Sequence, residues 1–190
     1  MPFAPNLPIE TERLLLRPFT RGDVDAVFAY RQREDVARYL FDGPMSYESC
    51  AEAVQARIQQ VSLAAENDRV TLAVARRDDA VLVGEITLIW RNVASQQGEV
   101  GYVFNPVFHG RGYAIEATRA LVELGFSGFG LHRIYARCDP RNTASFKLME
   151  RLGMRREAHF HEQTLVRGEW TDEYIYAVLA KDWRGQSASR

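Results

Sequence analysis

Apolar residues recur along the chain with two different periods. Runs rich in β-branched and aromatic residues predict strands, and apolar positions three and four residues apart predict helices. One predicted helix starts at Thr20 and Asp23, and the others cover residues 47–65, 112–126 and 143–152. The predicted strands cover residues 11–19, 70–75, 81–90, 99–104 and 133–138, followed by two strands that are joined near Gly168 and end at about Trp183.

The order of these elements is β-α-α-β-β-β-α-β-α-β-β. The three middle strands follow one another with short turns, and Asp78-Asp79 marks the first turn, so these strands are expected to pair antiparallel. Helices separate the other strands. We therefore expect an α+β fold, a mixed and mostly antiparallel sheet with helices on both faces.

The chain reads as one domain over residues 1–190, with its core over about residues 8–183. Its 190 residues are 46% hydrophobic, which is enough for a sizeable core, and no linker, repeat or low-complexity block interrupts them. The polar tail at residues 184–190 is predicted to fray.

Charge and cysteine content narrow the class of protein. The net charge is -1, so no basic field draws in nucleic acid or an anionic membrane, and we expect neither as a partner. Cys50 and Cys138 predict free thiols in a reducing compartment. No apolar run has the length of a membrane span and the N-terminus lacks the features of a signal peptide, so we expect a cytoplasmic protein.

The stretch NPVFHGRGYAIEA, residues 105–117, is the clearest candidate for chemistry. It lacks the lysine of an ATP phosphate loop, and Ile115 stands where a dinucleotide fingerprint needs its third glycine. Gly110 and Gly112 nevertheless allow a tight approach of the backbone. N–H groups from about Arg111 to Ala114, at the positive end of the following helix, would suit a diphosphate.

Two readings of this stretch stay open at this level. The glycines can bind a phosphate, or they can merely end a strand and open a turn. Arg111 can add a positive charge to the site or can simply be solvated. A strand that feeds the loop directly and small residues at Ala114 and Ala117 favour the binding site.

The run His109-Gly110-Arg111-Gly112-Tyr113-Ala114 matches the hallmark Gln/Arg-x-x-Gly-x-Gly/Ala of a known family at every position except the first. The chain resembles the GNAT superfamily of acetyl-CoA-dependent N-acetyltransferases, and within it the Rim-type branch that acetylates ribosomal-protein N-termini. The resemblance runs from about Pro8 to Trp183. Further stretches that carry it are IETERLLLRPF, VGEITL, EVGYVFNPVFHGRGYAIEA, NTASFKLMERLGMRREA and GEWTDEYIYAVLAKDW.

The resemblance implies where acetyl-CoA would bind. In the family the fourth and fifth strands splay apart, and the coenzyme enters between them. By position the open strand edge is Val103, Phe104 and Asn105, although an ordinary edge strand closed by Pro106 would look the same. The diphosphate would lie on residues 109–114. Asn142 would bind the pantetheine amides, cap its helix, or do both.

The resemblance also implies catalytic residues. Glu99 is the candidate base or holder of the amine, with Glu85 in reserve; either can equally be a solvated or hydrogen-bonded carboxylate. Met149 stands where many members carry a tyrosine that protonates the leaving thiolate. Ser145 is then the natural substitute, or else a serine on the helix surface. His109 replaces the usual Gln or Arg, a change in a position that mainly supports the loop.

Other residues receive less weight. Tyr102 is read as a core or rim aromatic. His159 and His161 share a strand face, but no third ligand follows at metal spacing, so no metal site is expected. Phe41, in the loop YLFDGPMSYE, and Asp172 are candidates for the acceptor side.

The expected activity is direct transfer of an acetyl group from acetyl-CoA to a primary amine, without a metal. The acceptor can be a protein N-terminus or a small amine. The alternative is a non-catalytic CoA-binding sensor or interaction module. The sequence leaves monomer and homodimer open.

Overall fold

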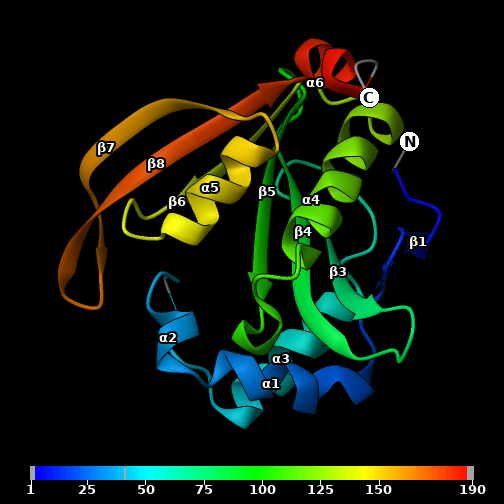
Figure 1. Cartoon of the computed structure of the whole chain (residues 1–190), viewed down its shortest axis with the longest axis vertical. Helices are drawn as coiled ribbons and strands as arrows, with labels where there is room; N and C mark the ends of the chain where they lie inside the picture. Colours follow the sequence, from blue (N-terminus) through cyan, green and yellow to red (C-terminus); the bar gives the residue numbers. More distant parts are fainter. Residues whose placement is uncertain (1–2, 41, 188–190) are drawn as a thin grey trace.

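The computed structural model describes residues 3–40 and 42–187, and in these residues a single eight-stranded sheet forms the centre of the molecule (Figure 1). The strand order is β1-β2-β3-β4-β5-β6-β8-β7. All neighbours pair antiparallel except β5 and β6, which pair parallel. The predicted mixed, mostly antiparallel sheet is confirmed. Its strands are β1 (Ile9–Glu10), β2 (Leu14–Arg17), β3 (Arg69–Arg76), β4 (Leu82–Asn92), β5 (Gln97–Phe104), β6 (Arg133–Cys138), β7 (Arg155–Val166) and β8 (Glu169–Leu179).

Helices cover both faces of the sheet, as predicted. On one face the buried side chains of α4 and α5, among them Leu121 and Leu148, pack on Leu72, Ile86 and Ile134. On the other face α1 and α3 pack against Ala73 and Leu82. The helices are α1 (Val24–Arg31), α2 (Glu34–Ala37), α3 (Tyr47–Ile58), α4 (Tyr113–Glu123), α5 (Thr143–Arg151) and α6 (Ala180–Ser187); 3₁₀ turns span Arg21–Asp23 and Pro106–Phe108, and a π-helical turn spans Leu124–Gly128.

The parallel pair β5 and β6 separates after three residues. Gln97, Gly98 and Glu99 pair with residues 133–135, whereas the rest of β5 pairs only with β4 and the rest of β6 only with β8. At the closed end a Cβ on Gly98 would lie 2.6 Å from Leu131 Cδ1, so a larger residue there would require the Leu131 side chain to shift. The predicted splay of the fourth and fifth strands is confirmed, and it lies between β5 and β6. Figure 1 shows α4 and α5 on either side of β5.

Several element ends differ from the prediction because tertiary contacts override the local pattern. The helix predicted over 47–65 ends at Ile58, since Val61 pairs with Val70 and Leu63 pairs with Phe3 instead of continuing the helix. The strand predicted over 11–19 is shorter, because Thr11 closes a turn onto Leu14. The short elements β1 and α2 were not predicted, and the helix predicted over 112–126 divides into α4 and the π-helical turn.

The C-terminal segment contains a helix that was not predicted. Residues 184–187 belong to α6 and residues 188–190 lie outside the described part of the chain, so fraying of the tail stays a prediction. Trp183 anchors this helix: it is buried, and its indole N–H donates to Glu123 at 2.7 Å. Figure 1 shows α6 at the end of α4.

Two further expectations can be compared with the structure. Cys50 and Cys138 are free thiols, as predicted. Among the described residues, no helix is long and apolar enough to cross a membrane.

The anchoring of α6 gives a prediction about stability. Trp183→Ala should lower the free energy of unfolding by about 3–5 kcal/mol, because it removes a buried aromatic and leaves a cavity. Urea unfolding followed by circular dichroism measures the loss. Lys181→Ala, at an exposed position of the same helix, is the matched control and should stay within about 0.5 kcal/mol of wild type. A loss that small for Trp183→Ala would show that α6 does not depend on this anchor.

Candidate active site

A cleft of about 680 Å³ opens where β5 and β6 separate. It is bounded by β5, the loop that leads into α4, the start of α5, and parts of α2 and the β7–β8 hairpin. Nearly all the site residues predicted from the sequence line it together. They are Glu99, Val103, Phe104, His109, Gly110, Gly112, Tyr113, Ala114, Asn142 and Ser145. Asn105 and Arg111 are not part of the lining.

The loop before α4 needs its glycines for their backbone conformation. Gly110 has φ +76° and Gly112 has φ +80°, values that a residue with a side chain adopts only with strain. A Cβ at Gly110 would meet nothing within 4 Å, so conformation and not crowding decides that position. Gly112 is the N-cap of α4, and the first turn of that helix lines the cleft through Tyr113 and Ala114. Backbone N–H groups of a first turn have no partner within their helix, so this turn can bind an anion.

Arg13, near the start of the chain, fixes the backbone of this loop. Its guanidinium donates to the carbonyl of Arg111 at 2.9 Å and to Glu116 of α4 at 2.7 Å. Thr11 donates to the same carboxylate at 2.6 Å. Partial burial acts to raise the pKa of Glu116, but the hydrogen bonds from Thr11 and Arg13 outweigh it and hold that pKa below its usual value. The sequence gives no sign of this clamp, because its partners are about a hundred residues apart.

The open edge of β5 differs in detail from the prediction. The Asn105 N–H donates to Val83 on β4, and its side chain accepts from Val107 N, so Asn105 ends the strand and caps the turn after it. Because successive residues of a strand face opposite edges, Phe104 and Tyr102 direct their backbone groups to the open edge, while Val103 faces β4. The prediction of an open edge at Val103, Phe104 and Asn105 therefore holds for Phe104 alone.

His109 ties the loop to the end of β5. Its Nε2 lies 3.1 Å from the carbonyl oxygen of Phe104. A carbonyl only accepts, so Nε2 carries the proton in this contact. His109 thus supports the loop, as expected for its position in the motif.

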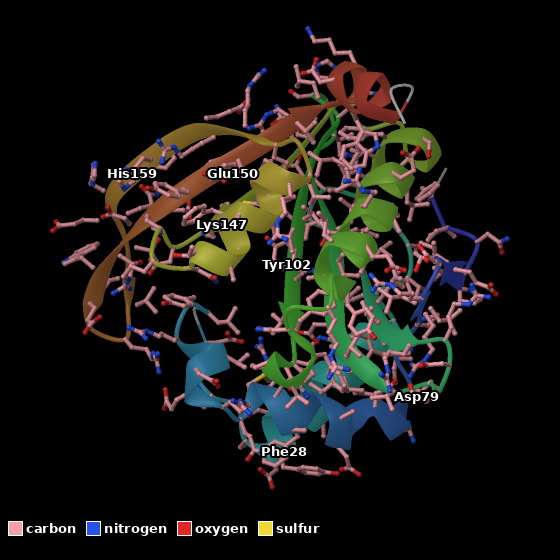
Figure 2. The ribbon with its side chains drawn as sticks, viewed as in Figure 1. Phe28, Asp79, Tyr102, Lys147, Glu150 and His159 are labelled. Atoms are coloured by element: carbon pink, nitrogen blue, oxygen red, sulfur yellow. The ribbon has the colours of Figure 1, made fainter. Side chains whose placement is uncertain are left out.

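Ser145 and Tyr102 line the cleft in direct contact with each other. Asn142 caps α5 by accepting from the backbone N–H of Ser145. Ser145 therefore lies in the first turn of the helix. The Ser145 hydroxyl lies 2.9 Å from the Tyr102 hydroxyl. Figure 2 shows Tyr102 at the centre of the molecule, between α4 and α5. The sequence analysis did not select Tyr102 as a site residue. Tyr102 and Glu99 are three residues apart on β5, so their side chains point to opposite faces of the sheet. This spacing was the available sign that Tyr102 faces the helices.

The groups around this pair are protonated at neutral pH. Burial raises the pKa of Tyr102 above its ordinary value, although the hydrogen bond with Ser145 acts against the shift. Burial likewise raises the pKa of Cys138 to about 11. Met149 is buried and lines the same cleft, so its position offers no acid. The Tyr102 phenol, which is neutral and hydrogen-bonded to Ser145, is therefore a proton donor in this part of the cleft.

Glu99 and Glu85 line the cleft and are both engaged by other side chains. Glu99 accepts from Arg91 at 2.7 Å, from Arg137 at 3.0 Å and from Tyr135 at 3.2 Å. Glu85 is buried and accepts from Arg57 at 2.9 Å and from Tyr30 at 3.2 Å. Burial and the nearby Glu85 charge raise the pKa of Tyr30 well above its ordinary value. Both of these carboxylates thus line the cleft, and Glu99 lies in the last residue pair before β5 and β6 separate.

One side of the cleft was predicted to bind the acceptor. Tyr39 and Leu40, from the segment after α2, line it, as does Asp172 of β8. Phe41, the residue predicted for this side, lies outside the described residues. The expectation for the loop around it therefore rests on its neighbours Tyr39 and Leu40.

Residues 13–155 match the family described as acetyltransferase (GNAT) domain. The chain belongs to this family, and it is an N-acetyltransferase of the acyltransferase class. It is 35% identical to YnaD of Bacillus subtilis, an uncharacterized N-acetyltransferase, over 92% of this chain and 98% of that protein. A crystal structure of a GNAT-family acetyltransferase from Bacillus anthracis superposes with a TM-score of 0.83 at 36% identity, over 92% of this chain and 99% of the other.

Two relatives with named acceptors are more distant. The spermidine N(1)-acetyltransferase of Vibrio cholerae is 26% identical over 92% of this chain and 98% of that protein. The alanine N-acetyltransferase of ribosomal protein uS5 from Escherichia coli is 31% identical over 44% of this chain and 43% of that protein. The second relative fits the resemblance to the Rim-type branch, and the two together leave the acceptor class open.

Proposed function

We propose that the protein transfers the acetyl group of acetyl-CoA directly to a primary amine in the cleft between β5 and β6. The observation that carries this proposal is the separation of the two strands after Glu99, which opens a strand edge directly before the Gly110–Gly112 loop. The open edge suits the amides of pantetheine, and the loop suits a diphosphate. A ligand that carries both groups in one chain would occupy both features at once.

Coenzyme binding in this proposal uses mainly backbone groups. The Phe104 edge pairs with pantetheine as an added strand would, and the N–H groups at the start of α4 bind the diphosphate. Asn142 at the start of α5 supplies an amide to the opposite side of the cleft. Arg13 has no direct part, but it fixes the loop through the Arg111 carbonyl.

The amine must lose a proton before it can attack, because an ammonium has no lone pair. Glu99 is our candidate for this step, by way of a water molecule, since three donors already engage its two oxygens. The amine nitrogen then forms its bond to the acetyl carbon, the carbon–sulfur bond breaks, and the nitrogen loses its second proton to solvent.

The departing thiolate needs a proton, and the Ser145–Tyr102 pair offers one. Ser145 lies in the first turn of α5 and receives its own hydrogen bond from the tyrosine or gives one to it. We assign the pair as the donor, with Tyr102 restoring the proton that Ser145 gives up. Solvent then reprotonates Tyr102.

The direct test is release of free CoA thiol from acetyl-CoA in the presence of an amine. The purified protein should release thiol with at least one member of a panel of peptides, amino acids and polyamines. Gly112→Val should abolish release and weaken acetyl-CoA binding by tenfold or more, because it puts a branched side chain at a positive φ where phosphate and backbone must meet. Gly130→Ala, at a positive φ away from the cleft, is the matched control.

Two results would count against this assignment. Tight acetyl-CoA binding with no thiol release for any amine would favour the alternative of a non-catalytic CoA-binding module. Unchanged acetyl-CoA affinity in a folded Gly112→Val protein would place the coenzyme elsewhere.

The role of Glu99 gives a pH-dependent prediction. Alkyl amines titrate near pH 10 and α-amines near 8, so most acceptor is ammonium at pH 7. Glu99→Gln should therefore lower kcat/KM about a hundredfold at pH 7, and raising the pH should restore part of the loss because the acceptor then deprotonates in solution. Recovery should come at lower pH for an α-amine than for a lysine-like amine. Activity equal to wild type across the whole pH range would leave Glu99 without this role.

The hydroxyl pair gives a second kinetic prediction. Tyr102→Phe and Ser145→Ala should each lower kcat by about tenfold or more, with acetyl-CoA affinity within about twofold of wild type. Because the two hydroxyls act as one unit, the kcat of the double variant should be only slightly lower than that of the less active single variant. Fully additive losses would show that the two residues act independently.

A further inference from the structure

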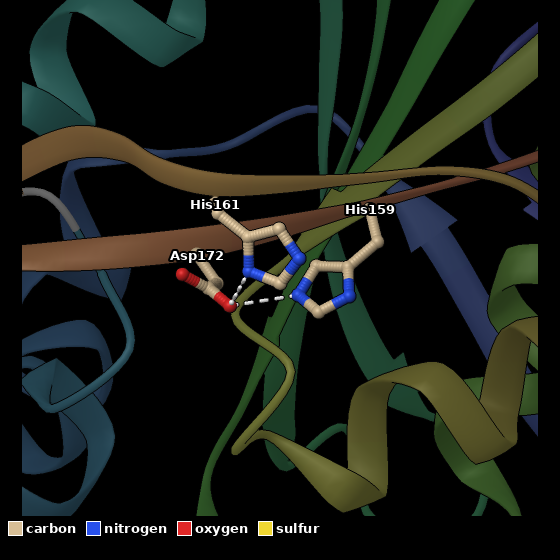
Figure 3. Close-up of side chains that lie close together, drawn as sticks. All are labelled: His159, His161 and Asp172. Carbon is tan, nitrogen blue, oxygen red and sulfur yellow. Dashed lines mark hydrogen bonds and ion pairs between the residues drawn. The ribbon is translucent and has the colours of Figure 1, made fainter.

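We propose that His159, His161 and Asp172 form a binding site for a divalent transition metal on the β7–β8 hairpin, outside the chemistry of acetyl transfer. Figure 3 shows both imidazole rings directed at one oxygen of the Asp172 carboxylate. The distances from that oxygen are 2.7 Å to His159 Nε2 and 3.0 Å to His161 Nδ1. The sequence showed no third ligand near the histidines, because Asp172 comes from the neighbouring strand.

The spacing of the three ligand atoms suits one ion. They all lie within 4.8 Å of one another. Zinc bound at about 2.1 Å by ligands in a tetrahedral arrangement would separate them by about 3.4 Å. The two nitrogen–oxygen separations, 2.7 and 3.0 Å, are shorter than that value. Rotation of the two rings would bring the ligand atoms to that spacing. Each ring nitrogen that faces Asp172 must be without a proton when it binds the ion, so its proton moves to the other ring nitrogen or to solvent.

The local backbone builds this arrangement. The pairing of β7 and β8 shifts between Phe160 and Thr164, and Glu162 takes a positive φ of 48°. Through this bulge the Glu162 N–H donates to the second Asp172 oxygen at 3.0 Å. One oxygen of the carboxylate is thus held by the backbone while the other faces the histidines. Carboxylates that bind a metal are commonly held in this way by a supporting hydrogen bond.

The chemistry of the set selects the class of ion. Two imidazoles and one carboxylate suit Zn²⁺, Ni²⁺ or Cu²⁺, whereas Mg²⁺ and Ca²⁺ prefer oxygen ligands alone. The His161 side chain is 74% exposed and those of His159 and Asp172 about a third, so an ion reaches the site directly from solvent.

The site lies where the pairing of β7 and β8 is interrupted. Thr171 and Asp172 line the large cleft, while the histidines lie on the neighbouring strand. An ion bound here would join β7 to β8 where their pairing is interrupted. Binding of the ion itself does not depend on the proposed transfer reaction.

The test is isothermal titration calorimetry, in which zinc chloride is added to chelator-treated full-length protein at pH 7.5. We expect one zinc ion per chain and a higher Tm in its presence. His159→Gln/His161→Gln and Asp172→Asn should each weaken binding at least tenfold, since even changes to supporting residues of metal sites cost about that much. His132→Gln, which removes another exposed imidazole, should bind zinc as wild type does. Magnesium chloride should give no heat of binding.

Three results would overturn the proposal: no saturable zinc binding in the wild type, equal binding in the double histidine variant, or equal loss in His132→Gln. Circular dichroism and the Tm of each metal-free variant show whether it is folded. Because the three ligand positions lie on an exposed hairpin and His132 is an exposed residue just before β6, we expect all three variants to fold.

Discussion

The loss of pairing between β5 and β6 is the constraint on which the rest of the site depends. Three residue pairs join the strands at one end, and beyond Glu99 each strand keeps a partner on its other side only. An unpaired edge in the middle of a sheet leaves backbone donors and acceptors that a ligand can satisfy. The same separation makes room between α4 and α5, so the edge, the loop and the first turns of both helices face one cleft.

Contacts between distant parts of the chain hold this opening in shape. Arg13, near the start of the chain, fixes both the Arg111 carbonyl and Glu116 at the start of α4. The His109 side chain contacts the Phe104 carbonyl, which links the loop to the end of β5. Such contacts place the ligand-binding backbone in advance, and a preorganised site loses less entropy when its ligand binds.

Local pattern predicted the order of the main strands and helices and the glycine motif, because these depend on periodicity and on conformations that only glycine adopts easily. The ends of the second helix and of the chain could not be predicted, since Val61 and Trp183 are placed by tertiary contacts. Tyr102 was missed because its partner Ser145 is 43 residues away. The edge assignment failed at Asn105 because the direction of each N–H depends on strand register, which the sequence does not reveal.

The central claim is that the coenzyme occupies the opening between β5 and β6, and amide hydrogen exchange tests it most directly. Exchange would be compared with and without saturating acetyl-CoA, residue by residue. The account predicts strong protection of the amides at Phe104 and at residues 111–114, with little change at Val103 and Asn105, which already face β4. Protection confined to other parts of the chain, with the Phe104 and 111–114 amides unchanged, would contradict it.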